Sequence, residues 1–198
     1  MRVGILGGVF NPPHIGHLVC AQEAHAQLAL GVVVFVPCGV PPHREIEQDP
    51  GADVRVDLCQ RAIGSDDRLA VSGVEVERRD PSYTVDTLRL LREQSPEDDL
   101  VLILGGDQAA ALPSWREPEE VLRLATVAAV ERAGRREQGI AEQAAEVEGA
   151  DRVVFFDMPR IDVSSTLVRA RVATGRPIRY LVPDAVADVI ADRELYRV

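Results

Sequence analysis

The sequence contains no lysine, and all 22 of its basic residues are arginine. Without a lysine amine the chain cannot form a lysyl-nucleotide intermediate or a Schiff base, so nucleotidyl transfer of the ligase type is excluded. The phosphate loop G-x-x-x-x-G-K-[ST] is excluded for the same reason. The G-x-G-x-x-G fingerprint of dinucleotide-binding proteins is absent as well, because Gly4, Gly7 and Gly8 do not have its spacing.

Cysteines are few and long apolar runs are lacking. Cys20, Cys38 and Cys59 are an odd number without C-x-x-C spacing, which predicts free thiols in a reducing cytoplasm. No apolar run approaches the roughly 20 residues that a membrane-spanning helix needs. The first residues also lack the pattern of a signal peptide. We therefore expect a cytoplasmic protein without a membrane partner.

The net charge excludes one class of partner. At a formal charge of -10 the chain is a poor nonspecific ligand for DNA or RNA, since such binding needs basic residues to neutralise phosphates. A small anionic substrate remains compatible with this charge, because a few local arginines can outweigh the overall field. With 198 residues and 46% hydrophobic content, we expect one domain, residues 1–198, with a proper core.

Apolar runs alternate with helical patterns along the chain, which predicts a parallel sheet covered by helices on both faces. The expected strands are Arg2–Leu6, Val32–Pro37, Leu69–Ser72, Leu100–Leu104, Thr126–Val130 and Val153–Asp157. The expected helices are Gly16–Leu30, Asp53–Ile63, Thr84–Glu93, Glu117–Leu124, Glu137–Glu146, Ser165–Thr174 and Asp184–Asp192. The fold class is therefore α/β with a Rossmann-like sheet. The long connection 38–51 is predicted to be a functional loop.

Residues 7–18, with the sequence GGVFNPPHIGHL, are the first candidate site. Two glycines and two histidines stand where the first strand gives way to a helix, and ligands of open α/β sheets bind at such places. Gly7 and Gly8 allow close approach of a phosphate. The helix N-terminus favours an anion, and His14 and His17 are spaced to share one face of the first turn.

Residues 163–169, with the sequence VSSTLVR, are the second candidate site. Ser164, Ser165 and Thr166 precede or open a helix, which is typical of an N-terminal cap. The same hydroxyls, followed by Arg169, also make an anion site. Arg171 is either part of that site or a surface charge.

Three further segments bear polar or aromatic candidates. The loop residues 41–44 (PPHR) expose Arg44, which can form a basic rim beside the site. Arg55 on the next helix either adds to this rim or has no part in it. Residues 82–87 (SYTVDT) open a helix, with Thr84 or Ser82 as its cap. Gly105 and Asp107 follow an apolar strand, where Asp107 either caps a helix or contacts a substrate hydroxyl or metal. Trp115, the single tryptophan, is either core or a stacking surface.

Together these segments resemble the nucleotidyltransferases with a His-x-Gly-His signature, and among them most closely the bacterial nicotinate mononucleotide adenylyltransferases. The resemblance runs from Met1 to Tyr196 in five blocks in the family's order. Val9 and Asn11 stand where that family has Thr and Asp, and Arg44 stands where it has Lys. It implies adenylyl transfer from ATP to nicotinate mononucleotide, by in-line attack without a covalent intermediate, as a step of NAD biosynthesis.

The resemblance also implies the roles of individual residues. The implied catalytic residues are His14, His17, Arg44 and Arg169. The implied ATP-binding residues are Gly7, Gly8, Phe10, His14, His17, Gly105, Asp107, Ser164, Ser165, Thr166 and Arg169. The implied mononucleotide-binding residues are Val9, Arg44, Thr84 and Trp115. Mg²⁺ is expected to arrive with ATP rather than in a metal site of the protein.

Other functions stay open at this point. A related adenylyltransferase would use nicotinamide mononucleotide or phosphopantetheine as the acceptor, and residues 82–87 with Trp115 favour a pyridine nucleotide. A fragment of a class I aminoacyl-tRNA synthetase is disfavoured by the short acidic chain. A nucleotide-binding regulator without catalysis is disfavoured because both phosphate motifs are intact. The oligomeric state is open, and a homo-oligomer is compatible with the sequence.

Overall fold

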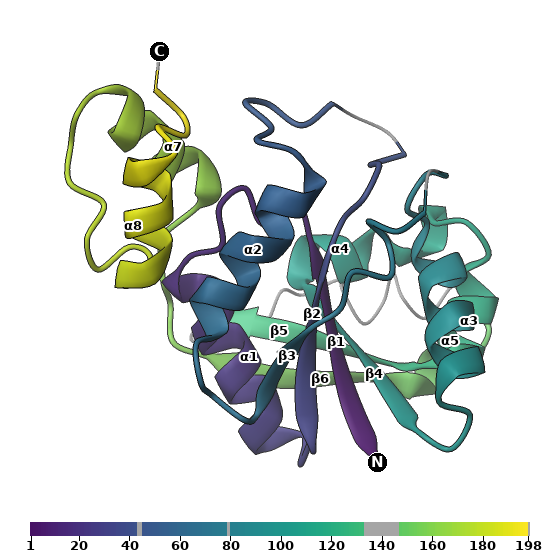
Figure 1. Cartoon of the computed structure of the whole chain (residues 1–198). Helices are drawn as coiled ribbons and strands as arrows, with labels where there is room; N and C mark the ends of the chain where they lie inside the picture. The colour runs from purple at the N-terminus through teal and green to yellow at the C-terminus, as the bar shows by residue number, and fades with distance from the viewer. Residues whose placement is uncertain (43–44, 79, 133–146, 198) are drawn as a thin grey trace.

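The computed structural model describes residues 1–42, 45–78, 80–132 and 147–197. Six parallel strands form one sheet in the order β3-β2-β1-β4-β5-β6 (Figure 1). The strands are β1 (Arg2–Gly8), β2 (Val32–Pro37), β3 (Leu69–Val71), β4 (Asp99–Gly105), β5 (Thr126–Arg132) and β6 (Val153–Met158). The predicted α/β class with a Rossmann-like parallel sheet is confirmed.

Helices connect these strands and cover both faces of the sheet (Figure 1). They are α1 (Ile15–Gln27), α2 (Ala52–Ile63), α3 (Thr84–Gln94), α4 (Gly106–Ala110), α5 (Pro118–Leu124), α7 (Ser165–Ala173) and α8 (Asp184–Asp192). The short 3₁₀ helices η1 (Leu112–Ser114) and η2 (Ala150–Arg152) complete the described part. The sequence did not predict α4, η1 or η2, and the predicted helix Glu137–Glu146 lies outside the described residues. No helix in the described ranges is long and apolar enough to cross a membrane.

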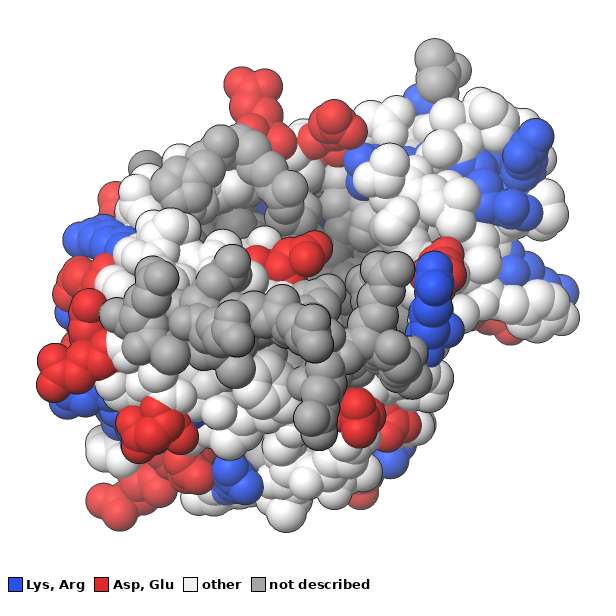
Figure 2. Space-filling view, turned by 180° about the vertical axis from the view of Figure 1, so that it is seen from behind, with Lys and Arg blue, Asp and Glu red and all other residues white. Residues whose placement is uncertain are grey.

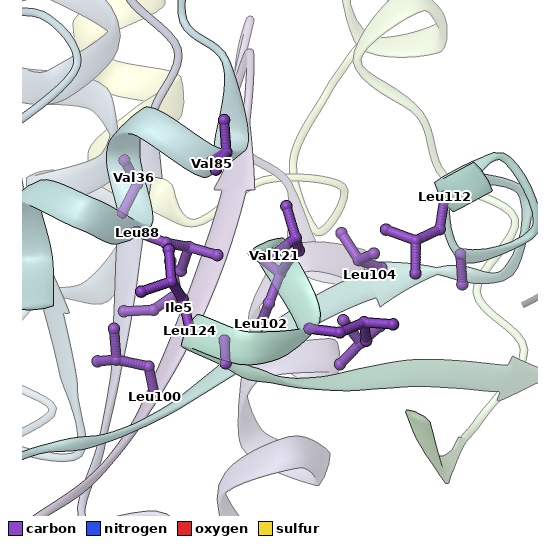
Figure 3. Packing of buried hydrophobic residues seen from close by; sticks show 14 of the residues in the cluster. Ile5, Val36, Val85, Leu88, Leu100, Leu102, Leu104, Leu112, Val121 and Leu124 are labelled. Atoms are coloured by element: carbon purple, nitrogen blue, oxygen red, sulfur yellow. The ribbon is translucent and has the colours of Figure 1, made fainter. Parts of the chain in front are cut away.

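The side chains of the central strands alternate between two hydrophobic clusters, as the two-residue period of a strand requires. Ile5 of β1 and Leu102 of β4 point to the face covered by α3 and α5, where Val85 and Val121 pack against them (Figure 3). Full burial of such a side chain stabilises the fold by about 1.5–3 kcal/mol. The larger cluster is therefore the main anchor of α3, which begins beside the carboxyl edge of the sheet.

The opposite face of the sheet is covered by α1 and α2. Leu6 and Ile103 point there and pack with Ala21 and Ala24 of α1 and with Cys59 of α2. The two alanines are fully buried, which brings the helix axis close to the sheet. The N-terminus of α1 is thereby fixed directly after β1.

A third cluster attaches α7 and α8 to the outer side of α2, away from the sheet (Figure 1). Leu58 of α2, Val168 of α7 and Val186 of α8 are fully buried in it. This packing brings the second candidate motif, at the beginning of α7, back to the carboxyl edge of β1.

The candidate site lies where the strand order reverses. β1 pairs with β2 on one side and with β4 on the other, so their connections run to opposite faces and leave a crevice at the carboxyl edge. β1 extends through Gly7 and Gly8, two residues beyond its predicted end at Leu6, because Gly8 pairs with Pro37. A Cβ on Gly7 or Gly105 would have no neighbour within 4 Å, so both strand ends border open space.

Candidate functional site

His14 and His17 lie at the beginning of α1, and their imidazole rings stack with centroids 3.8 Å apart. His14 is the residue before the first helical turn and is 8% exposed, whereas His17 is partly buried. The two rings lie together as their spacing predicts, although His14 precedes the first helical turn instead of lying on it.

Both imidazoles are neutral at neutral pH. Burial lowers the pKa of His14 to about 4, and burial together with the nearby His14 lowers the pKa of His17 to about 3. The Nδ1 atom of His17 accepts a hydrogen bond from the His14 backbone N–H at 3.1 Å. The proton of the neutral His17 ring is therefore on Nε2, which makes that atom a hydrogen-bond donor.

Two glycines allow aromatic rings to pack closely around the histidines. A Cβ on Gly16 would lie 3.1 Å from the His14 ring, and a Cβ on Gly8 would lie 3.1 Å from the Phe10 ring. The buried Phe10 ring meets His17 edge to face, with centroids 5.0 Å apart. A side chain at Gly16 would therefore press against the His14 ring and displace it by a few tenths of an ångström.

The second motif contacts the first. Ser164 caps α7 by accepting a hydrogen bond from the Leu167 N–H at 3.1 Å, as predicted. The Ser165 hydroxyl donates to the Pro12 carbonyl at 2.8 Å. Thr166 is exposed in the first turn of α7. Two of the three hydroxyls are thus used to build the site, which leaves the Thr166 hydroxyl and the first N–H groups of α7 to face an anion.

Arg169 is held at the same place. Its guanidinium donates to the Asn11 carbonyl at 2.9 Å and pairs with the Glu47 carboxylate at 3.2 Å. The Arg169 side chain is 11% exposed, while that of Glu47 is 83% exposed. No local pattern identifies Glu47 as a site residue, because it lies 122 residues from its partner.

Asn11 connects three distant parts of the chain. Its amide donates to the Glu47 carbonyl at 2.8 Å, and its Oδ1 atom accepts from the Tyr196 hydroxyl at 2.7 Å. A carboxylate at this position could not donate to Glu47. Asn11, at the position of the family's Asp, therefore has a structural role in this chain. The partners are 36 and 185 residues away, so the sequence could not identify them.

Gly105 and Asp107 lie at the end of β4, next to the end of β1. Gly105 is the residue before α4, and Asp107 is exposed in the first turn of that helix. Asp107 is therefore not the capping residue that one interpretation of the sequence expected. Its carboxylate faces solvent at the carboxyl edge, beside the open space above Gly105.

The segment before α3 differs from the predicted cap. Neither Ser82 nor Thr84 caps α3: the residue before the helix is Tyr83, and the first turn has no side-chain cap. The Ser82 hydroxyl instead accepts hydrogen bonds from the N–H groups of Gly39 and Val40, each at 3.2 Å. Thr84 is the first residue of α3, so it stands at an N-terminus without a side-chain cap.

Trp115 is connected to this helix N-terminus through the next residue, Arg116. It is partly buried and packs against the larger hydrophobic cluster. The next residue, Arg116, lies over the Tyr83 ring at 4.8 Å and pairs with Asp86 of α3 at 3.3 Å. The structure thus brings Trp115 and Thr84 into one region, although they are 31 positions apart in the sequence.

The three remaining candidate arginines are Arg55 and Arg44 of the predicted basic rim and Arg171 of the second candidate site. Arg55 is not part of a rim, because its side chain is 0% exposed and its donors are used inside the protein. Arg44 and the preceding His43 lie outside the described residues. Arg171 donates to the Pro177 carbonyl at 2.7 Å, which is a structural contact within the C-terminal segment.

The charged residues are unevenly distributed along the chain. Between residues 160 and 197 the chain has seven arginines and five acidic residues, in contrast to its net charge of -10. Figure 2 shows basic side chains gathered over the part of this face that bears the C-terminal helices. In the described residues, no cluster of three or more His, Cys, Asp and Glu is placed to hold a metal. The region around α7 is therefore the part of an acidic protein that best suits an anion.

Comparisons with known proteins agree with this arrangement. A model of the cytidylyltransferase-like family matches residues 5–171. A protein of Rubrobacter xylanophilus, described as a probable nicotinate-nucleotide adenylyltransferase, is 37% identical, with 100% of this chain and 92% of that protein covered. One of Exiguobacterium sibiricum with the same description is 40% identical, with 99% of each covered.

A solved structure has the same fold. The chain resembles the nicotinic acid mononucleotide adenylyltransferase of Plasmodium falciparum, solved in complex with NaAD, with a TM-score of 0.77. The match covers 98% of this chain and 97% of that one at 18% sequence identity. At this identity the likeness supports the architecture of the sheet and its helices.

The lowered pKa of His17 has a measurable consequence for stability. The unfolded chain binds this proton near pH 6.5 and the folded chain near pH 3, so stability present above pH 6.5 is lost as the pH falls. His17→Asn keeps an acceptor for the His14 N–H and removes the titration. Between pH 7.5 and 5, we expect unfolding free energy to fall by about 2 kcal/mol more in the unmodified protein than in His17→Asn. Urea unfolding at both pH values measures this, and equal losses would contradict the assignment.

Proposed function

The chain belongs to the nicotinate-nucleotide adenylyltransferases of the cytidylyltransferase-like family, and we propose that its site transfers the adenylyl group of ATP to nicotinate mononucleotide. The products are nicotinate adenine dinucleotide and pyrophosphate, in a step of NAD biosynthesis. One observation carries the proposal beyond family membership. The His-x-Gly-His segment and the N-terminus of α7 meet at the sheet edge through Ser165–Pro12 and Arg169–Asn11 contacts.

ATP would lie across the reversal of strand order. Gly7, Gly8 and Gly105 leave room for its close approach. The Phe10 ring packs edge to face against His17 and would hold that ring toward the nucleotide. The α-phosphate would face His14 and His17. The β- and γ-phosphates would face the N-terminus of α7, with Arg169 as the forked donor that suits phosphate.

Nicotinate mononucleotide would lie on the side of α3. Thr84 stands at a helix N-terminus that no side chain caps, which suits the pyridine carboxylate. The partly buried indole of Trp115 offers a stacking face for the ring. Val9, at the carboxyl edge, would lie between the two substrates, and Arg44 would add a phosphate contact.

The reaction needs positioning more than proton transfer. The phosphate monoester of the mononucleotide is already an anion at neutral pH, so it attacks the α-phosphorus in line without a general base. His14 and His17 are neutral in the free protein and would donate hydrogen bonds to the α-phosphate. A bound polyanion would also raise their pKa values, since an opposite charge favours the protonated form. Charge developing on pyrophosphate would be stabilised by Arg169.

Mg²⁺ would accompany ATP and neutralise charge on its phosphates. The described residues fit a metal that arrives with the nucleotide, because they supply single carboxylates at this edge and no preformed cluster. Asp107, exposed beside Gly105, is the side chain that would hold it, directly or through water.

Pyrophosphate release on mixing the protein with ATP and each acceptor tests the function. We expect the acid mononucleotide to be preferred over the amide by about 5- to 150-fold in kcat/KM. An amide group would leave helix N–H donors unpaired, a loss of roughly 1–3 kcal/mol. A rate equal or higher with nicotinamide mononucleotide would contradict the acceptor assignment, and activity with phosphopantetheine alone would favour the other related transferase. Nucleotide binding without pyrophosphate release would favour a regulator.

His17→Asn should reduce kcat by about 10²–10³-fold, because it removes the Nε2 donor aimed at the transition state. The variant keeps the acceptor for the His14 N–H, so the fold should stay intact. Steady-state kinetics with a thermal melt measures both effects. A folded variant with unchanged kcat would exclude His17 from the mechanism.

Glu47→Gln should lower the KM for ATP by about two- to five-fold. The Glu47 carboxylate pairs with Arg169, so a phosphate must displace it, and exposed ion pairs contribute roughly 0.2–1 kcal/mol. Glu45→Gln is the matched control, since it removes the same charge from the same exposed loop two residues away. An equal decrease in both variants would show that only the overall charge matters.

A further inference from the structure

Arg55 has the largest of the fully buried side chains, although it is charged. Its Nε atom donates to the Asp49 carboxylate at 3.0 Å. Its Nη1 atom donates to the carbonyls of Val9 at 3.1 Å and Cys38 at 2.6 Å, and Nη2 donates to the Gly39 carbonyl at 3.3 Å. A single guanidinium thus contacts the ends of two neighbouring strands, β1 and β2.

These contacts exceed what packing alone would require. Burying a charge is costly, and an apolar side chain of similar volume is often as good or better for stability. The Asp49 carboxylate is 32% exposed, and the other three partners are neutral carbonyls. The planar fork of arginine matches several acceptors in fixed directions, which lysine cannot do. The arrangement therefore holds backbone geometry rather than adding hydrophobic stability.

The backbone of residues 38–40, directly after β2, makes hydrogen bonds on two opposite sides. The carbonyls of Cys38 and Gly39 point to Arg55, while the N–H groups of Gly39 and Val40 point to the Ser82 hydroxyl. A trans peptide directs its C=O and N–H to opposite sides, so the two sets of bonds fix the same peptide planes. A Cβ on Gly39 would lie 2.2 Å from the Glu75 carbonyl, so only glycine fits at this position.

Resting on the proposed function, we propose that Arg55 is a positioning residue that sets the ATP-binding turn relative to the mononucleotide-binding segment. Val9, itself among the residues expected to contact the mononucleotide, begins the turn that carries Phe10 and leads to His14 of the expected ATP site. Ser82 lies two residues before Thr84 at the start of α3. The chain of contacts from Val9 through Arg55 and Gly39 to Ser82 spans the two candidate substrate sites. In-line transfer depends on that relative position, and a displacement of about 1 Å can reduce the rate about 10²-fold.

Three variants test this role in the full-length protein. Arg55→Lys keeps the charge but not the planar fork, and its three N–H donors cannot satisfy the carboxylate and the three carbonyls that Arg55 contacts. Ser82→Ala removes the hydrogen bonds to the N–H groups of Gly39 and Val40 and leaves Arg55 in place. Leu30→Ala is the control: Leu30 is 4% exposed and packs against Gly4, far from the carboxyl edge of β1, so its loss destabilises without touching the site.

Pyrophosphate release gives kcat and both KM values, calorimetry gives the affinity for ATP and for the mononucleotide separately, and a thermal melt gives Tm. We expect Arg55→Lys to lose about 10²-fold in kcat and Ser82→Ala about 10-fold, with each separate affinity changed less than about 3-fold. Leu30→Ala should lower Tm at unchanged kcat, measured below its melting range.

Two other results are distinguishable. Near-normal kcat in folded Arg55→Lys, or a kcat loss that Leu30→Ala reproduces, would overturn the positioning role. If Arg55→Lys does not fold, Ser82→Ala decides, and an unchanged kcat there would overturn it equally. Failure of the unmodified protein to release pyrophosphate would instead refute the proposed function itself.

Discussion

Hydrogen bonds to the backbone carbonyls of residues 9–12 hold the candidate site together. Arg55 reaches the Val9 carbonyl, Arg169 the Asn11 carbonyl and Ser165 the Pro12 carbonyl, across sequence separations of 46, 158 and 153 residues. Each donor comes from a helix that is anchored by its own hydrophobic packing. A short turn after one strand thus becomes the common reference for α2 and α7. Because buried carbonyls must be paired, the turn and the two helices fix one another.

Local features of the sequence predicted much of this arrangement. Apolar runs and helical periods identified the six strands and most helices, and the spacing of His14 and His17 predicted their shared face. Those inferences succeed because they depend on neighbours within one or two helical turns. The short helix α4 was missed because five residues carry too little periodicity to be recognised.

Features that depend on distant partners could not be predicted. An arginine in the first turn of the helix that follows the loop 38–51 suggests a surface charge, yet Arg55 is buried because carbonyls from two strand ends converge on it. The cap of α3 was predicted wrongly because the Ser82 hydroxyl accepts hydrogen bonds from Gly39 and Val40 after β2, not from the first turn of α3. Asn11 could not be assigned a role without Glu47 and Tyr196. In each case tertiary contacts outweighed the local preference of the residue.

The attachment of α7 and α8 to α2 links nucleotide binding to local unfolding. These helices lie outside the sheet and are held by the third cluster and by the Ser165–Pro12 and Arg169–Asn11 hydrogen bonds. They can therefore separate from α2 while the six-stranded sheet stays paired. Separation would carry Arg169 and the α7 N-terminus away from the histidines. A ligand that contacts both parts binds only the closed form, so its binding energy opposes opening. Protection of the C-terminal helices against hydrogen exchange would then report occupancy of a site to which they contribute only one edge.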